Sequence, residues 1–414
     1  MKAKEWPKYI LLFLRDFVLA VIVGAGVGAY STVFGMLVGW AGAFRQSHEW
    51  ITLLLPVAGL AIAALYRGSK CADSKGTNRV ILSISEGDNI RLQMAPLITV
   101  STVITHLFGG SAGREGAALQ IGGCLGQNFA KLLKVNSGTM KILTMCGMSA
   151  AFSALFGTPV AAAIFSIEIV SVGVMYYSAI MPCAAASATG YIVSVLMGAG
   201  HERWSGIVSM AGFDWLMCLK VCALGVLCAI LSIFFCIAMH RCEEAYRKFI
   251  PDQYIRALTG GFLVIAVTMV TGTADYQGAG TDIIEAALGG SAAPYAFALK
   301  IILTALTLGA GFKGGEIIPT IFAGATFGCV AGPLLGIPAP CAAALGVCGL
   351  FCGVTNAPLA TLAICFELFG FEGALYFLLV AAISFRLSGY YSLYSSQNFT
   401  QAKSYPGIIN RKSD

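Results

Sequence analysis

Residues 147–169 read GMSAAFSALFGTPVAAAIFSIEI, and residues 346–368 read GVCGLFCGVTNAPLATLAICFEL. The two stretches match 199 positions apart, and the shared positions hold glycine, phenylalanine, proline and glutamate, namely Gly147, Phe152, Pro159 and Glu168 in the first and Gly346, Phe351, Pro358 and Glu367 in the second. Upstream, at an offset of 201, Gly113 and Glu115 meet Gly314 and Glu316. Apolar segments resemble each other by composition, but composition does not readily supply matched glycine, proline and glutamate. The sequence therefore contains an internal repeat.

The composition around the repeat is that of a membrane protein. Hydrophobic residues make up 57% of the 414 residues and charged residues 11%, against about 25% charged in soluble domains. A net charge of +6, dispersed along the chain, excludes a nucleic-acid binder, and the composition excludes a soluble enzyme or a disordered chain. Because one crossing needs about 20 apolar residues, roughly ten or more crossings fit. We therefore expect an all-α, multi-pass integral protein of the cell membrane.

The charged residues form islands that predict opposite orientations for the two halves. The positive-inside rule places the N-terminus, residues 67–75 and residues 241–256 in the cytoplasm, and residues 45–50 and 273–285 outside. The first long span, to about residue 43, then leaves the cytoplasm, whereas the span from 215 to 239 enters it. Opposite orientation with repetition predicts an inverted repeat whose broken helices meet near the membrane midplane. We expect halves at 1–200 and 201–400, a loop near 198–213, a short cytoplasmic tail at 401–414 and both termini in the cytoplasm.

Two glycine-rich segments interrupt the apolar pattern, and each carries a glutamate. Residues 109–116 read GGSAGREG, and residues 309–319 read GAGFKGGEIIP. Each predicts an unwound stretch followed by the start of a helix, whose free N–H groups and dipole bind anions. Glycines alone are common where membrane helices pack. A carboxylate within the membrane is costly and usually functional, so Glu115 and Glu316 favour a site.

Glu115 is the candidate gate. Its carboxylate can occupy an anion site as a tethered anion, or it can take a proton, become neutral and move aside, which would couple proton and anion movement. Arg114 is better interpreted as a structural partner or a capping cation. A phosphate-binding loop is not supported, because no Lys-Ser/Thr pair ends the GGSAGREG segment. Most of the 14 cysteines lie in apolar stretches and indicate packing, so no metal or other cofactor is expected.

These segments resemble motifs of the CLC family of chloride channels and anion/proton antiporters. Residues 113–116 with Gln-Ile-Gly-Gly at 120–123 resemble its GREGP…QIGG motif, residues 314–319 are similar to GxFxP, and residues 392–395 resemble the segment with the pore tyrosine. The resemblance implies a homodimer with inverted halves and one pore per subunit. It also implies Glu115 as the external gate, Tyr394 as a hydroxyl donor to the anion, and the Ile317 and Ile318 amides as part of its cradle.

The same resemblance implies the remaining anion-binding residues. They lie in the three motif segments, and we assign Gly76, Thr77 and Asn78 from the degenerate GSGIP segment, Gly113, Arg114 and Gly116 from GREG, and Gly315 from the GxFxP-like segment. Thr77 is an uncertain equivalent of the central serine, because only the glycine of GSGIP is clearly kept. No pair of nucleotide-binding CBS domains is expected after residue 400.

Two departures favour the fluoride/proton antiporter branch of the family. The inner relay glutamate of chloride exchangers falls at Ile169, which cannot carry a proton, while Glu316 stands inside the GxFxP-like motif. We predict that Glu316 is the second proton acceptor; the alternative is that it only caps its helix. That branch typically places methionine where Thr77 stands, which does not match.

The predicted function is proton-coupled fluoride export, with fluoride or chloride, protons and the lipid bilayer as partners and no nucleic acid. A chloride channel or chloride/proton antiporter is the alternative within the family. An intramembrane enzyme, with Glu115, Glu168 and His106 as metal ligands, is a remote alternative, since no HExxH or paired-histidine spacing is present.

Overall fold

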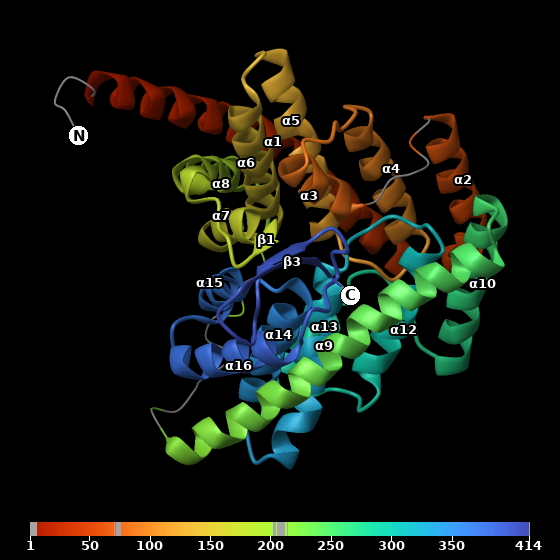
Figure 1. Cartoon of the computed structure of the whole chain (residues 1–414). Helices are drawn as coiled ribbons and strands as arrows, with labels where there is room; N and C mark the ends of the chain where they lie inside the picture. Colours follow the sequence, from red (N-terminus) through yellow and green to blue (C-terminus); the bar gives the residue numbers. More distant parts are fainter. Residues whose placement is uncertain are drawn as a thin grey trace.

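The computed structural model describes residues 6–69, 71, 76–201, 204, 212 and 214–413, and these residues form sixteen α-helices with a small sheet (Figure 1). The all-α prediction is confirmed. The first half contains α1 (Trp6–Ser47), the 3-10 helix η2 (Glu49–Leu54), α2 (Leu55–Gly68), α3 (Thr77–Ser85), α4 (Met94–Leu107), α5 (Glu115–Leu132), α6 (Ser137–Phe156), α7 (Pro159–Glu168), β1 (Ser171–Val172), the 3-10 helix η3 (Tyr177–Ala179) and α8 (Ile180–Leu196).

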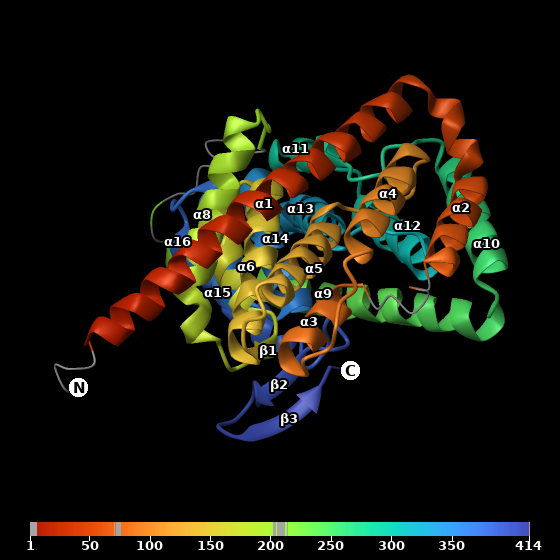
Figure 2. The same cartoon turned by 90° about the horizontal axis from the view of Figure 1, so that it is seen from above.

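The second half repeats this order of long and short helices. It contains α9 (Trp215–Phe249), α10 (Gln253–Thr271), α11 (Thr281–Leu288), α12 (Ala296–Gly309), α13 (Ile317–Leu334), α14 (Ala339–Thr355), α15 (Pro358–Phe369), α16 (Ala374–Leu387), β2 (Asn398–Gln401) and β3 (Ile408–Lys412). In Figure 2, α1 lies across α6 and α8, which it contacts, and in Figure 1 the long α9 crosses the front of the molecule.

Some helices continue beyond the predicted spans into charged segments. The span predicted at 215–239 continues as α9 to Phe249, inside the island at 241–256, and α10 begins in the same island at Gln253. Charged side chains at the end of a helix reach water without ending the helix, as in the pair of Arg247 with Glu243 at 2.7 Å. Part of the acidic loop forms α11. The half boundary at 198–213 lies largely outside the described residues, including Glu202 and Arg203.

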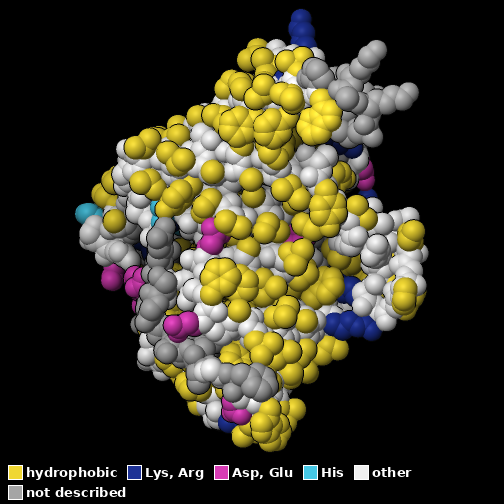
Figure 3. Space-filling view, turned by 90° about the vertical axis from the view of Figure 1, so that its left-hand side faces the viewer, with side chains coloured by type: hydrophobic (Ala, Val, Ile, Leu, Met, Phe, Trp, Pro, Cys, Tyr) yellow, Lys and Arg dark blue, Asp and Glu magenta, His cyan; other side chains and the backbone are white. Residues whose placement is uncertain are grey.

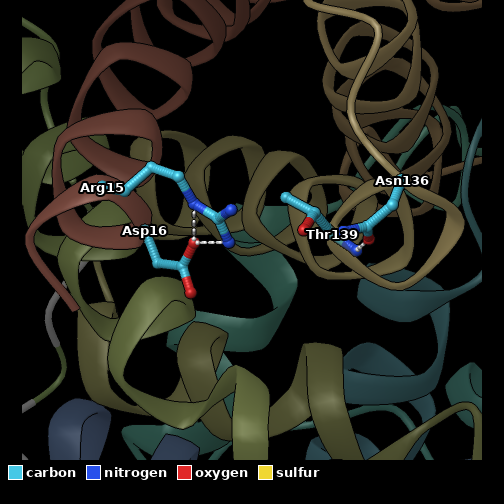
Figure 4. Close-up of polar contacts among 4 residues, drawn as sticks. All are labelled: Arg15, Asp16, Asn136 and Thr139. Carbon is cyan, nitrogen blue, oxygen red and sulfur yellow. Dashed lines mark hydrogen bonds and ion pairs between the residues drawn. The ribbon is translucent and has the colours of Figure 1, made fainter. Parts of the chain in front are cut away.

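Polar side chains make local contacts in α1 and at the start of α6 (Figure 4). Asn136 is the N-cap of α6, and its Oδ1 accepts a hydrogen bond of 2.8 Å from the backbone N–H of Thr139. In the apolar α1, the Arg15 guanidinium pairs with the neighbouring Asp16 carboxylate at 2.8 Å. The pair reduces the charge that the apolar helix carries there.

The repeat glycines lie where two helices cross in each half. A Cβ added to Gly147 of α6 would lie 2.1 Å from the carbonyl oxygen of Gly122 in α5. In the second half, a Cβ on Gly346 of α14 would lie 2.2 Å from the carbonyl oxygen of Gly324 in α13. Such contacts bring the two helix backbones together, as small residues allow in membrane proteins. The match of Gly147 with Gly346 in the sequence therefore reflects the same packing in each half.

We expect Gly147→Ala to destabilise the protein strongly. The added methyl group cannot fit without moving α5 away from α6, and overpacking of this kind costs about 1–3 kcal/mol. Gly39→Ala in α1 is the matched control, because no atom outside its own helix turn lies within 4 Å of its added Cβ. Thermal melting of the detergent-solubilised protein should show a clear drop for Gly147→Ala only. Equal melting temperatures for the two variants would contradict this packing argument.

The two glutamates of the repeat, Glu168 and Glu367, each cap a helix in the opposite half. The Glu168 carboxylate of α7 accepts hydrogen bonds from the backbone N–H groups of Leu359 (3.1 Å) and Ala360 (2.8 Å) at the start of α15. The Glu367 carboxylate of α15 accepts from Val160 (3.0 Å) and Ala161 (2.8 Å) at the start of α7. Carboxylates stabilise helix N-termini, so each half completes a helix of the other.

The two glycine-rich segments are repeated in a register different from the one the sequence suggested. α5 begins at Glu115 and α13 begins at Ile317, so their N-caps are Arg114 and Glu316. The offset between these helices is therefore 202, not 201, and the pairing of Glu115 with Glu316 was wrong by one residue. Matching glutamates by identity hid this shift, which places the two carboxylates at different positions relative to their helix starts.

The end of the chain forms a sheet rather than a simple tail. β2 pairs in parallel with β1 of the first half, through Ser171 with Asn398, and antiparallel with β3. In Figure 2 the strands lie at one side of the helical bundle, where the C-terminus ends. Seven described helices of at least 18 residues are apolar enough to cross a membrane, alongside shorter apolar helices of 10–17 residues. One face is largely hydrophobic (Figure 3).

Candidate functional site

The two glycine-rich segments meet each other at one antiparallel bridge. The Gly113 N–H donates to the Gly315 carbonyl at 2.7 Å, and the Gly315 N–H donates to the Gly113 carbonyl at 2.7 Å. A Cβ on Gly315 would lie 2.4 Å from the backbone nitrogen of Gly116, so a side chain cannot be accommodated there. This contact places the start of α5 beside the start of α13.

A third helix begins at the same place. Gly76 is the N-cap of α3 with φ of +57°, a conformation that favours glycine. The Thr77 hydroxyl lies 3.5 Å from the Gly116 carbonyl oxygen, and the Gln120 side-chain amide donates to the Thr77 hydroxyl at 3.4 Å. The N-termini of α3, α5 and α13 thus converge, and their free N–H groups provide the positive ends that an anion needs.

Glu115 occupies the N-terminus of its own helix. The side chain is 1% exposed, and its Oε2 accepts a hydrogen bond of 3.1 Å from the backbone N–H of Arg114. The Arg114 guanidinium lies 3.4 Å from Oε1, in agreement with the predicted role of Arg114 as a structural partner. The carboxylate is therefore held at the start of α5, and its role as a tethered anion stays a prediction.

Glu316 lies on the other side of the same junction. It is the N-cap of α13, but its side chain makes no capping hydrogen bond to that helix, which weakens the capping interpretation. A Cβ on Gly116 would lie 3.1 Å from Oε2 of Glu316, while a Cβ on Gly113 would lie 3.0 Å from Oε2 of Glu115. The two carboxylates therefore flank the short segment from Gly113 to Gly116.

Two cavities end on these two carboxylates. The first, of about 850 Å³, is lined by Glu115, Arg114 and the ends of α1 and α10, and we call it the Glu115 cavity. The second, of about 540 Å³, is lined by Glu316, Lys313 and residues of α3 and α9, and we call it the Glu316 cavity. The two sets of lining residues share no member. The junction of the glycine-rich segments thus separates two approaches to the site.

The structure brings most of the predicted anion-binding residues to this junction. Those that line the Glu316 cavity are Gly76, Thr77 and Asn78, those that line the Glu115 cavity are Arg114 and Ile318, and Gly113, Gly116 and Gly315 form the bridge. Ile317 begins α13 and is fully buried. The Asn78 side-chain oxygen accepts from the Ser396 N–H at 2.9 Å, so its carbonyl is used in joining α3 to the C-terminal segment. Their roles as anion ligands stay predictions.

Tyr394 and Ile169 complete this region. The Tyr394 side chain is fully buried, and its hydroxyl has no hydrogen-bond partner among the described residues, which leaves a donor for an anion. Ile169 follows α7 and is buried, and its carbonyl accepts from the Gln397 side chain at 3.0 Å. The Ile169 side chain cannot carry a proton, so Glu316 stays the candidate for the second proton acceptor.

The metal-enzyme alternative gains no support. Glu168 is used to cap α15 and lines neither the Glu115 cavity nor the Glu316 cavity. In the described part of the chain, no three His, Cys, Asp or Glu side chains gather closely enough to hold a metal ion.

Sequence reasoning did not place Arg45 and Gln277 in the Glu115 cavity, and it named His106 only as a metal ligand of the remote enzyme alternative. Arg45, at the end of α1, donates through Nη1 to the Gln277 side-chain oxygen at 2.9 Å. His106, at the end of α4, is 3% exposed and also lines the cavity. The signal for Arg45 was available, since it is the cation of the outer island at 45–50. Nothing in the sequence indicated that Gln277 would meet it.

Comparison with known proteins gives consistent results. Residues 58–389 match the model of the voltage gated chloride channel family. A chloride/fluoride channel protein of Pseudomonas syringae pv. tomato is 32% identical over 392 residues, which cover 93% of this chain and 86% of that protein. An H(+)/Cl(-) exchange transporter ClcA of Yersinia pestis is 23% identical, over 85% of this chain and 79% of that protein. The crystal structure of a CLC-type fluoride/proton antiporter superposes with a TM-score of 0.90 at 30% identity, covering 93% of this chain and 98% of that one.

Proposed function

Because the chain belongs to the voltage gated chloride channel family, whose members transport anions, we propose that it exchanges fluoride for protons across the cell membrane. The observation that carries the proposal is the pair of cavities that approach one junction and end on two different carboxylates, Glu115 and Glu316. An open channel needs one continuous pore. An exchanger needs a site reached in turn from two sides, with groups that bind protons beside it.

The proposed orientation follows the charge islands. Residues 45–50 and 273–283 lie around the Glu115 cavity, so that cavity opens outside the cell by the positive-inside rule. The Glu316 cavity is lined by residues 239–247 of α9 and opens to the cytoplasm. Fluoride enters from the cytoplasm through the Glu316 cavity and leaves through the Glu115 cavity, while the proton moves in the opposite direction.

The exchange rests on competition for the backbone N–H groups at the junction. The Glu115 carboxylate holds the Arg114 N–H, so an incoming anion must displace it. Protonation of a carboxylate oxygen from the outer side neutralises Glu115 and frees it to leave. The proton then passes to Glu316 and reaches the cytoplasm. Two buried carboxylates and an anion close together cannot all keep their charge cheaply, so anion entry favours protonation.

The choice of fluoride is supported by the relatives and by two residues. The chloride/fluoride channel protein and the CLC-type fluoride/proton antiporter, which are 32% and 30% identical to this chain, are both named for fluoride. Glu316 and Ile169 distinguish the chain from chloride exchangers in the way the family resemblance implies. We also propose a homodimer in the lipid bilayer with both termini in the cytoplasm; the hydrophobic face in Figure 3 suits lipid or a second copy.

We expect reconstituted protein to transport fluoride at least as fast as chloride. Fluoride is small and is itself a strong hydrogen-bond acceptor, so it gains most from the converging N–H groups. It also gains from the Tyr394 hydroxyl, which has no hydrogen-bond partner among the described residues. Proteoliposomes loaded with both anions, with efflux followed by fluoride- and chloride-selective electrodes and proton uptake by a pH electrode, measure this directly. Chloride flux with fluoride excluded would refute the fluoride assignment and leave a chloride transporter of the same family.

A further inference from the structure

Arg45 lines the Glu115 cavity and Lys300 lies behind its lining residue Gly278, and among the described residues neither has a carboxylate partner. Arg45 bonds to the Gln277 amide, and its buried Nε has no hydrogen-bond partner among the described residues. Lys300 of α12 is fully buried behind the cavity wall, where its ammonium donates to the carbonyls of Tyr276 (3.1 Å) and Gly278 (2.7 Å). Within the described residues neither cation forms an ion pair. Buried charges are usually paired, so these two create a positive field that stabilises an anion in the cavity.

His106 adds a ring nitrogen that can take a proton. Its Nδ1 lies 2.9 Å from the Thr102 carbonyl oxygen, which can only accept, so Nδ1 carries the hydrogen. In the neutral ring Nε2 is then a lone pair, and this atom is buried without a hydrogen-bond partner among the described residues. A lone pair repels an anion. Once protonated, the same nitrogen becomes a donor that an anion can accept from.

The charges that face His106 make its protonation depend on the anion. Arg45 on α1 and Arg114 at the start of α5 line the same cavity as His106, and Lys300 on α12 donates to the carbonyl of the lining residue Gly278, so a proton on the imidazole would add to a positive region. The acidic side chains of the cavity are Glu115, which pairs with Arg114, and Glu49, Asp275 and Asp282 in the segments that line it. An anion beside the ring offsets the three cations. Proton binding and anion binding therefore strengthen each other.

We propose that Arg45 and His106 form a second anion site in the Glu115 cavity, which binds a small halide together with one proton on His106 Nε2. Gln277 is a positioning residue, because it holds the Arg45 guanidinium and in turn donates to the Thr268 hydroxyl at 3.3 Å. The site lies on the path by which the anion leaves in the proposed function, on which its physiological role rests. In the binding step, solvent supplies the proton, one N–H bond forms, and no electrons are exchanged.

The test measures binding without transport. Isothermal titration of sodium fluoride, and separately of sodium chloride, is performed on the detergent-solubilised Glu115→Gln/Glu316→Gln protein, in which neither junction carboxylate titrates. Because one proton accompanies the anion, we expect the affinity of this site to rise about tenfold per pH unit as the pH falls. The added His106→Gln exchange keeps an amide donor and removes the titration, so binding should persist without the pH dependence.

Arg45→Gln is expected to weaken anion binding at this site by about tenfold or more, and Arg45→Lys should restore most of it. His48→Gln is the matched control, since His48 is exposed at the end of α1 and does not line the cavity. Size-exclusion profiles identify any variant that fails to fold, and bromide-soaked crystals should show an anomalous peak beside Arg45. Anion binding that is independent of pH and unchanged by Arg45→Gln would overturn the site. Proton-linked binding of chloride but not of fluoride would support the site and contradict its place on the path of fluoride, whereas fluoride export itself is decided by the efflux measurement.

Discussion

Glu115→Gln should abolish proton movement while anions still cross. The amide has the size of the carboxylate and can still accept from the Arg114 N–H through its oxygen, so the local packing is kept. It cannot take a proton, and it loses the ion pair with the Arg114 guanidinium. We expect proton flux to fall by about 100-fold or more, as for the loss of a group that must transfer a proton.

The measurement is proton uptake by proteoliposomes on an outward fluoride gradient, with fluoride efflux recorded at the same time. Glu49→Gln is the control, because Glu49 lines the same cavity and is exposed. It should leave the ratio of protons to fluoride unchanged. A Glu115→Gln protein that still drives protons uphill would remove Glu115 from the mechanism.

Glu316→Gln should stop coupled exchange with the fold preserved. The Glu316 carboxylate lies against Gly116 and lines the Glu316 cavity, and it makes no capping hydrogen bond to α13. Because capping contributes nothing there, the stability should change little, whereas a capping carboxylate would contribute about 0.3–1 kcal/mol. The proton entering through Glu115 would have no second acceptor, since Ile169 cannot serve. We expect proton transport to fall by about 100-fold or more.

Glu243→Gln provides the comparison for this experiment. Glu243 lines the same cavity but pairs with Arg247 and is half-exposed, so water can replace it as a proton carrier. We expect near-normal exchange from that variant and a melting temperature close to the wild type for both. Normal proton transport by Glu316→Gln would end the relay proposal while leaving Glu115 as the gate.

The sequence predicted those features that depend on local chemistry. Each glycine-rich segment indicated that a helix begins close by, and α5 and α13 do begin there, at Glu115 and Ile317. The matched Pro159 and Pro358 begin α7 and α15. Features that depend on which residues meet across the fold were not predictable. The match of Glu168 with Glu367 was visible, but that each carboxylate caps the other half was not.

The errors have a common physical origin. Charge in the sequence indicates access to water, not the end of a helix, and so the span predicted at 215–239 stops before the end of α9 at Phe249. Because Glu115 and Glu316 are both glutamates, we aligned the two repeats at an offset of 201. The first residues of α5 and α13 show that the offset is 202. The sequence suggested His106 only as a metal ligand. Its place in the cavity that Arg45 also lines depends on how α1, α4 and the loop after α10 meet, which the sequence does not reveal.

The exchanged caps on α7 and α15 constrain how the chain can be made. When the ribosome has produced α7, the N–H groups of Val160 and Ala161 have no carboxylate to bind, because Glu367 has not yet been synthesised. Until then the N–H groups at this helix end depend on water or other acceptors. We expect the two halves to complete each other's caps only after the whole chain has been made. A nascent chain stopped between the halves would expose that defect to quality-control proteases, so only full-length chains should accumulate.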